Sequence, residues 1–162
     1  MDRQLIEQYA RGGEKLDQSI RGLTREDLLA MPSSSDAKVG KWSIHQVVIH
    51  LLDSDLIAMD RIKRMIAMPN PQLIGYDENL FIQHLLPEEQ SVEDAIKVLD
   101  LSFKNFARVL RKLPDEAFDR PGMHNERGRV TAGEYIGFMV KHMDHHLKFI
   151  HAKRAAMGKE MW

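Results

Sequence analysis

Hydrophobic residues recur every three to four positions over most of this chain, and no alternation of apolar and polar residues persists. This spacing is typical of amphipathic α-helices with one buried face. The first helix is predicted over residues 2–20, with an interruption at Gly12-Gly13. A short helical turn is expected at residues 24–29, followed by a polar loop at residues 32–36.

A second helix is delimited by its capping residues. Ser43 followed by Gln46 fits a capping box, in which the two side chains satisfy each other's backbone donors. The helix is expected to run to about residue 66. A loop containing Tyr76-Asp77-Glu78 and an apolar segment at residues 80–82 follow it.

Two more helices complete the pattern. One is predicted over residues 91–113, and a long connection through residues 121–128 follows it. Thr131 with Glu134 fits another capping box and opens the last helix, which is expected to end near Gly158. Four long amphipathic helices in 162 residues predict an all-α, single-domain four-helix bundle over residues 1–162.

Composition narrows the classes of function. Lys and Arg (23) nearly balance Asp and Glu (24), so nothing favours binding to nucleic acid or to an acidic membrane surface. The absence of cysteine excludes disulfides, thiolate metal ligands and a cysteine nucleophile. The charged N-terminus lacks an apolar signal core, and no stretch approaches the roughly 18 apolar residues of a membrane span, so a cytoplasmic protein is expected.

The candidate chemistry lies in the last predicted helix, which contains the run His142-Met143-Asp144-His145-His146. His142 and His146 are one turn apart and therefore share a face. At about 100° per residue both fall within the apolar arc of the helix, whereas His145 falls at its polar edge. Two inward imidazoles need polar partners, because burying them unpaired is costly. A shared metal ion would satisfy both, and packing against backbone or carboxylate partners is the alternative.

A third nitrogen ligand would complete an open site of the catalytic type. The best donor is His50 on the second predicted helix, although it projects only to the edge of that helix's apolar arc. Asp53 is either an acceptor that orients the His50 ring or an ordinary exposed acid. Asp55 projects onto the apolar arc, which indicates a polar pocket or a pair with a buried cation.

The remaining candidates are interpreted as structural. His124 lies in a predicted loop, where it could line the rim of a pocket, but a solvated loop residue is the favoured interpretation. Trp42 is expected to pack at the start of the second helix. Surface or partly buried positions are expected for the other histidines, His45, His84 and His151. The chain contains no Glu-x-x-His pair of a di-iron bundle, no H-E-x-x-H motif, no G-x-S-x-G elbow and no Gly-rich phosphate loop.

The order of these motifs resembles the DinB/YfiT-like superfamily over nearly the whole chain. The segment from Lys41-Trp42-Ser43 to His50 and Asp53 is similar to that family's second-helix signature, in which a histidine and then an acidic residue follow a Trp-Ser/Thr opening. Tyr76-Asp77-Glu78 resembles its middle loop. The last helix, with its H-x-x-H-H cluster, resembles the family's final helix.

The resemblance implies a metal site formed by His50, His142 and His146, with His145 as a neighbour that is not normally a ligand. It also implies a bundle in up-down-down-up order, often a homodimer, that binds zinc or nickel with open positions. Some members of the family are thiol S-transferases that use a low-molecular-weight thiol such as bacillithiol or mycothiol, and others are described as hydrolases.

These observations favour a metal-dependent enzyme, a thiol S-transferase or a hydrolase, whose three-histidine site activates a bound thiol or water for a small-molecule substrate. The alternative is a non-catalytic metal-binding bundle for small-ligand sensing or for a structural or dimeric interaction. A bundle without metal, in which the histidines are only packed, is the third possibility. The sequence assigns no catalytic acid or base.

Overall fold

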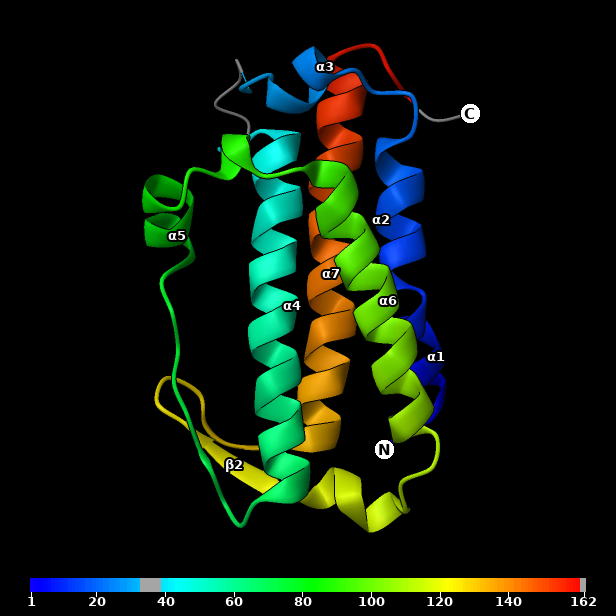
Figure 1. The fold of residues 1–162 in the computed structure, drawn as a ribbon, viewed down its shortest axis with the longest axis vertical. Coiled ribbons are helices and arrows are strands. Elements are labelled where there is room, and N and C mark those ends of the chain that lie inside the picture. Colours follow the sequence, from blue (N-terminus) through cyan, green and yellow to red (C-terminus); the bar gives the residue numbers. More distant parts are fainter. Residues whose placement is uncertain (33–38, 161–162) are drawn as a thin grey trace.

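Four helical rods surround one hydrophobic core in the computed structural model, which describes residues 1–32 and 39–160. The first rod consists of α1 (Gln4–Ala10) and α2 (Gly12–Ile20). The other three rods are α4 (Ile44–Ala67), α6 (Val92–Leu110) and α7 (Ala132–Ala156). Figure 1 shows the first and last rods running upward and α4 and α6 running downward. The all-α four-helix bundle and its up-down-down-up order are therefore confirmed.

The predicted caps define the helices that carry the candidate site. Ser43 accepts from the backbone of Gln46 at the start of α4, and Thr131 accepts from Glu134 at the start of α7, with the reciprocal bond present in both boxes. The short helix α3 (Arg25–Leu29) opens with a third such box. Most of the polar loop predicted at residues 32–36 lies outside the described residues.

A small sheet closes the lower end of the bundle, where only loops were expected. Its strands are β1 (Gln72–Leu73), β2 (Pro121–His124) and β3 (Gly128–Thr131). β2 pairs in parallel with β1 and antiparallel with β3. Strands of two to four residues are too short to show an alternating pattern in the sequence, which explains why they were missed.

The connection from α4 to α6 returns along the outside of the bundle, so these two rods run in the same direction (Figure 1). It carries β1, the helix α5 (Glu78–His84) and the 3₁₀ turn η1 (Pro87–Glu89). A second 3₁₀ turn, η2 (Asp115–Asp119), leads from α6 to the β2–β3 hairpin. The crossover thus brings the middle loop of the sequence beside α4.

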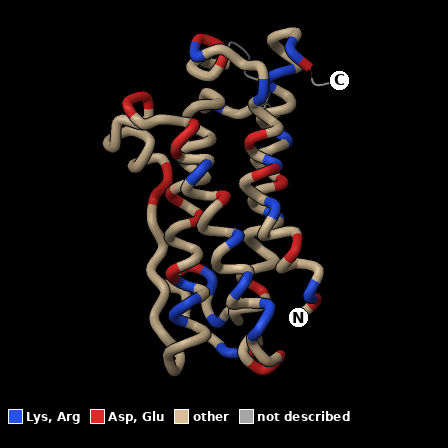
Figure 2. The backbone as a smooth tube through the Cα atoms, turned by 45° about the vertical axis from the view of Figure 1, so that its right-hand side comes forward, with Lys and Arg blue, Asp and Glu red and all other residues tan. Residues whose placement is uncertain are grey.

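Charged residues of both signs are interspersed along the helices (Figure 2), as the net charge of −1 leads one to expect. In the part of the chain that the structure describes, no helix is both long enough and apolar enough to pass through a membrane.

The break in the first rod occurs at Arg11, one residue before the glycine pair, and Gly13 has a packing role. α2 approaches α6 so closely there that a Cβ atom on Gly13 would lie 2.5 Å from the Cα atom of Asp100. Backbone atoms of a packed helix have little freedom to move aside. Gly13 is therefore required for the α2–α6 contact.

Gly13→Ala is expected to lower the free energy of unfolding by about 1–3 kcal/mol, the usual cost of overpacking, although alanine favours helices. Gly137→Ala is the matched control, because a Cβ there would lie 3.5 Å from Leu5 Cδ1, an ordinary contact. That variant should match the parent or gain up to about 1 kcal/mol. Urea unfolding measures both, and a Gly13→Ala protein as stable as Gly137→Ala would contradict the packing argument.

Candidate metal centre

Three imidazole rings converge in the middle of the bundle. His50 comes from α4, and His142 and His146 come from successive turns of α7, the helix with which α4 makes its largest interface. One nitrogen from each ring lies within 4.8 Å of the others. The Nε2 atom of His142 is 3.3 Å from that of His50 and 3.1 Å from that of His146. The structure thus brings together the three residues singled out as metal ligands.

Two of the three nitrogen–nitrogen distances match those expected around one divalent metal ion. Tetrahedral coordination with Zn–N bonds of 2.0–2.1 Å places ligand nitrogens about 3.3 Å apart. The donor set of three imidazoles suits zinc and nickel. Within the described residues the group contains these three donors and no fourth side chain, so one or more coordination positions would stay open.

The three rings are neutral at ordinary pH, as metal ligation requires. Burial is the main reason that the pKa of each ring is lowered, and neighbouring histidines lower it further. The pKa of His50 falls to about 3 through burial and the proximity of His142. Burial and neighbouring positive groups lower the pKa of His142 to about 4 and that of His146 to about 2. Each ring therefore offers a free lone pair.

The second ring nitrogens differ in their surroundings. The Nδ1 atoms of His142 and His146 are buried and have no hydrogen-bond partner among the described residues. The Nδ1 atom of His50 lies 3.5 Å from the Ser54 hydroxyl. Among the described residues no hydrogen bond joins Asp53 to His50. The Ser54 hydroxyl is also 3.3 Å from the Nε2 atom of His50, so Ser54, and not Asp53, is the side chain in contact with this ring.

Ser54 links His50 to Tyr76 in the crossover. Its hydroxyl donates to the backbone carbonyl of His50 at 2.8 Å and lies 2.7 Å from the Tyr76 hydroxyl. Because the single serine proton is already used, the tyrosine must be the donor in that second bond. Burial raises the pKa of Tyr76 to about 12, so the phenol keeps its proton at neutral pH. The Ser54–Tyr76 hydrogen bond therefore holds the crossover against the side of α4 that carries His50.

Trp42 covers one side of the site. Its ring centroid is 4.8 Å from that of His50, and its plane lies parallel to that of His146, within 7°, at 6.5 Å. The sequence assigned this residue only to packing at the start of α4. Trp42 lies just before the N-cap residue Ser43 and eight residues before His50, a spacing of about two helical turns that could have placed it beside the site.

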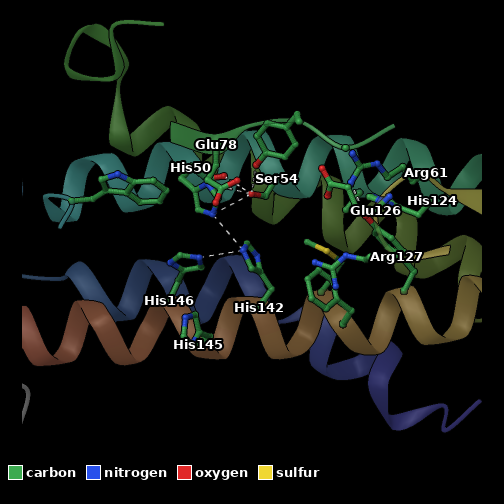
Figure 3. Close-up of a pocket in the computed structure, with 17 residues that line it drawn as sticks. His50, Ser54, Arg61, Glu78, His124, Glu126, Arg127, His142, His145 and His146 are labelled. Atoms are coloured by element: carbon green, nitrogen blue, oxygen red, sulfur yellow. Dashed lines mark hydrogen bonds between the residues drawn. The ribbon is translucent and has the colours of Figure 1, made fainter. Parts of the chain in front are cut away.

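The three histidines form part of the wall of a pocket of about 370 Å³ between α4, α7, the crossover and the β2–β3 hairpin. Figure 3 shows the histidine cluster at one end of this pocket and Arg61, His124 and Arg127 at the other. His145 is exposed and lies outside the metal-binding group, with its ring centroid 5.4 Å from that of His146. A ligand of small-molecule size fits this volume.

Two histidines were misplaced by the sequence interpretation. His124 is not a solvated loop residue but is buried in β2, because residues 121–124 pair with β3. His45 is buried rather than at the surface, and its Nε2 atom lies 2.8 Å from the carbonyl oxygen of Pro87. His84 and His151 are exposed, as expected.

Comparison with known proteins places this chain in a family. Residues 8–150 match the sequence signature of the DinB superfamily. A protein of Oceanobacillus iheyensis named "Putative metal-dependent hydrolase" is 32% identical over 111 residues, which cover 68% of this chain and 64% of that protein. A Bacillus cereus protein of the same name is 27% identical over 145 residues, covering 89% of this chain and 80% of its own.

A solved structure has the same fold. YfiT from Bacillus subtilis, described as "a probable metal-dependent hydrolase with an unusual four-helix bundle topology", superposes with a TM-score of 0.86 at 24% identity. The match covers 96% of this chain and 86% of that one.

Proposed function

This chain belongs to the DinB superfamily, and from that premise we propose that it is a metal-dependent enzyme, a hydrolase or a thiol S-transferase, acting at His50, His142 and His146. The observation that carries the proposal is the convergence of three neutral imidazoles on the wall of an open pocket. A purely structural metal site is normally closed by four protein ligands. The names of the relatives in Oceanobacillus iheyensis and Bacillus cereus support a metal-dependent reaction.

A zinc or nickel ion bound there would supply Lewis acidity and lower the pKa of a water or thiol beside it. The neutral rings add no negative charge, so they leave that effect undiminished. Whether water or a thiol is the nucleophile decides between hydrolysis and S-transfer. The chain itself holds no cysteine, so a thiol would come from a small cosubstrate.

Other side chains around the three histidines enclose the part of the pocket in which a substrate would react. Trp42 shields one face of His50 from water, and the Ser54–Tyr76 link holds the crossover against the site. Glu78, which Figure 3 shows beside His50 and Ser54, lines the same pocket. In this proposal its carboxylate takes the proton that the nucleophile releases.

The test is turnover by protein loaded with zinc or nickel. Nitrophenyl acetate alone measures hydrolysis, and chlorobimane with and without cysteine measures thiol transfer. We expect one of the two rates to scale with bound metal and to fall at least tenfold in Glu78→Gln, while metal content stays the same. Metal-loaded protein that turns over neither substrate and binds neither cysteine nor chlorobimane would refute the proposed function.

A further inference from the structure

The pocket continues well beyond the three histidines, along the face that α4 shares with α7. Ser54, Ala58 and Arg61 follow His50 at intervals of about one turn and line the same wall. At 1.5 Å per residue, the eleven residues from His50 to Arg61 span about 16 Å of helix axis. The pocket therefore has a second end, which Figure 3 shows opposite the histidine cluster.

Arg61 carries a buried positive charge at this second end. Its side chain is 8% exposed, and its guanidinium donates to two neutral acceptors, the Tyr135 hydroxyl at 2.6 Å and the Ile74 carbonyl. Within residues 1–32 and 39–160, no carboxylate forms an ion pair with it. A guanidinium has five N–H groups, so three have no hydrogen-bond partner among the described residues. A buried charge of this kind is costly unless an anion compensates it.

His124 adds a second donor beside Arg61. The backbone N–H of Glu126 donates to its Nδ1 atom at 3.2 Å, so the neutral ring carries its proton on Nε2. Burial, followed by the nearby Arg61, lowers the pKa of His124, which keeps the ring neutral. Among the described residues the Nε2 atom of His124 has no hydrogen-bond partner, and the residue lines the pocket. Its N–H is therefore available to an acceptor in a ligand.

The other charges at this end are exposed and nearly cancel. Arg127 lies over the Phe138 ring, with its guanidinium carbon 4.0 Å from the ring centroid. The Glu126 carboxylate lies against Gly75, where a Cβ atom would be 2.5 Å from its Oε1 atom. Water and salt screen exposed charges far more than buried ones. Arg61 therefore dominates the electrostatic potential at this end of the pocket.

We infer that this end is an oxyanion subsite, in which Arg61 and His124 bind the carboxylate or phosphate group of an elongated small molecule. The subsite needs no metal. Its link to catalysis rests on the proposed function, in which the reactive centre of the same molecule lies at the histidines. A single inorganic ion cannot span both ends, so the substrate class is a small molecule with an anionic terminus.

Calorimetric titration with benzoate and phenyl phosphate tests the subsite, with neutral benzamide as the shape control. We expect benzoate, phenyl phosphate or both to bind the parent and benzamide not to bind. Arg61→Met should weaken that binding about 10- to 100-fold, the usual effect of losing a charge-assisted hydrogen bond. Arg64→Met, on the exposed side of the same helix, should leave it unchanged. The tighter of the two ligands identifies the natural oxyanion.

Glu126→Gln covers the case in which Arg61→Met fails to fold. Glu126 is exposed, and removing its charge should tighten anion binding severalfold. No binding of benzoate or phenyl phosphate, or affinities that neither Arg61→Met nor Glu126→Gln alters, would overturn the subsite.

The same titration on His146→Ala protein separates this proposal from the proposed function. Anion affinity should persist there, because the subsite does not involve the histidine cluster. Affinity that disappears in His146→Ala would place the anion on the metal and overturn the subsite. Arg61-dependent binding without any turnover by metal-loaded protein would support the subsite and remove the proposed function.

Discussion

His146→Ala is expected to leave purified protein nearly free of zinc and nickel, whereas the parent should contain close to one equivalent. The variant removes one of three converging nitrogens and leaves His50 and His142 as a two-ligand site. We expect metal affinity to fall by two orders of magnitude or more, since changes to residues that only orient metal ligands already cost 10- to 100-fold. Elemental analysis of untagged protein at known concentration measures the result.

His145→Ala is the matched control. It changes an adjacent histidine of the same helix, but one that is exposed and outside the metal-binding group. Its metal content should equal that of the parent. Metal binding should also raise the melting temperature of the parent and of His145→Ala, because a ligand that binds only the folded state stabilises it. A parent that takes up no metal after reconstitution, or equal retention by His146→Ala, would reduce the cluster to packed histidines.

Periodicity was sufficient to find two of the three histidines of this site. His142 and His146 share a face because they lie on one helix, and that relation follows from the sequence spacing alone. His50 could not be selected in the same way. It lies at the edge of its own helix face, and it reaches the cluster only through the packing of α4 on α7. The resemblance to a family supplied it, and the structure places it there.

Residues brought in by irregular segments were the least predictable. His124 reaches the pocket because a strand of four residues pairs with its neighbours, and Tyr76 because the crossover returns along α4. Neither of these two segments carries a periodic pattern, so the sequence could assign His124 and Tyr76 only to loops. Arg61 lies about three turns after His50 on the same helix, which follows from the sequence spacing. That no carboxylate among the described residues pairs with it is visible only in three dimensions.

The sequence left two interpretations of Asp55, a polar pocket or a pair with a buried cation, and the structure bears on both. The residue is 2% exposed on α4, and its Oδ2 atom has no hydrogen-bond partner among the described residues. It lines a small cavity with Tyr9 and Lys15, but the lysine forms its ion pair with Asp144, at 2.9 Å. Among the described residues Asp55 therefore has no cation partner, and the cavity that it lines contains apolar side chains such as Phe103 and Met139 as well as polar ones.

This environment makes the protein's stability depend on pH. Burial raises the pKa of Asp55 well above its usual range, and burial and the Asp55 charge raise that of Tyr9. In the unfolded chain the aspartate titrates near 3.9. Above that pH the folded state binds more protons at this residue than the unfolded state does. The free energy of unfolding therefore falls as pH rises from about 4 towards the pKa of the folded state.

Asp55→Asn should remove this dependence while keeping the side-chain shape. At pH 7 to 8 we expect the variant to be more stable than the parent by about 1–3 kcal/mol, the range for an unsatisfied buried polar group. The difference should shrink as the pH falls towards 4 and should be smallest below about pH 3, where the carboxyl group is protonated in both states of the parent. Urea unfolding at several pH values measures it.

Asp60→Asn provides the control, because this aspartate is exposed on the same helix and pairs with Arg64 at 2.6 Å. Its removal should change stability little and leave the pH profile of the parent intact. An Asp55→Asn protein less stable than the parent at pH 8 would show that the ionised carboxylate has a compensating partner. A gain that stays constant from pH 4 to pH 8 would show that the effect comes from packing and not from proton binding.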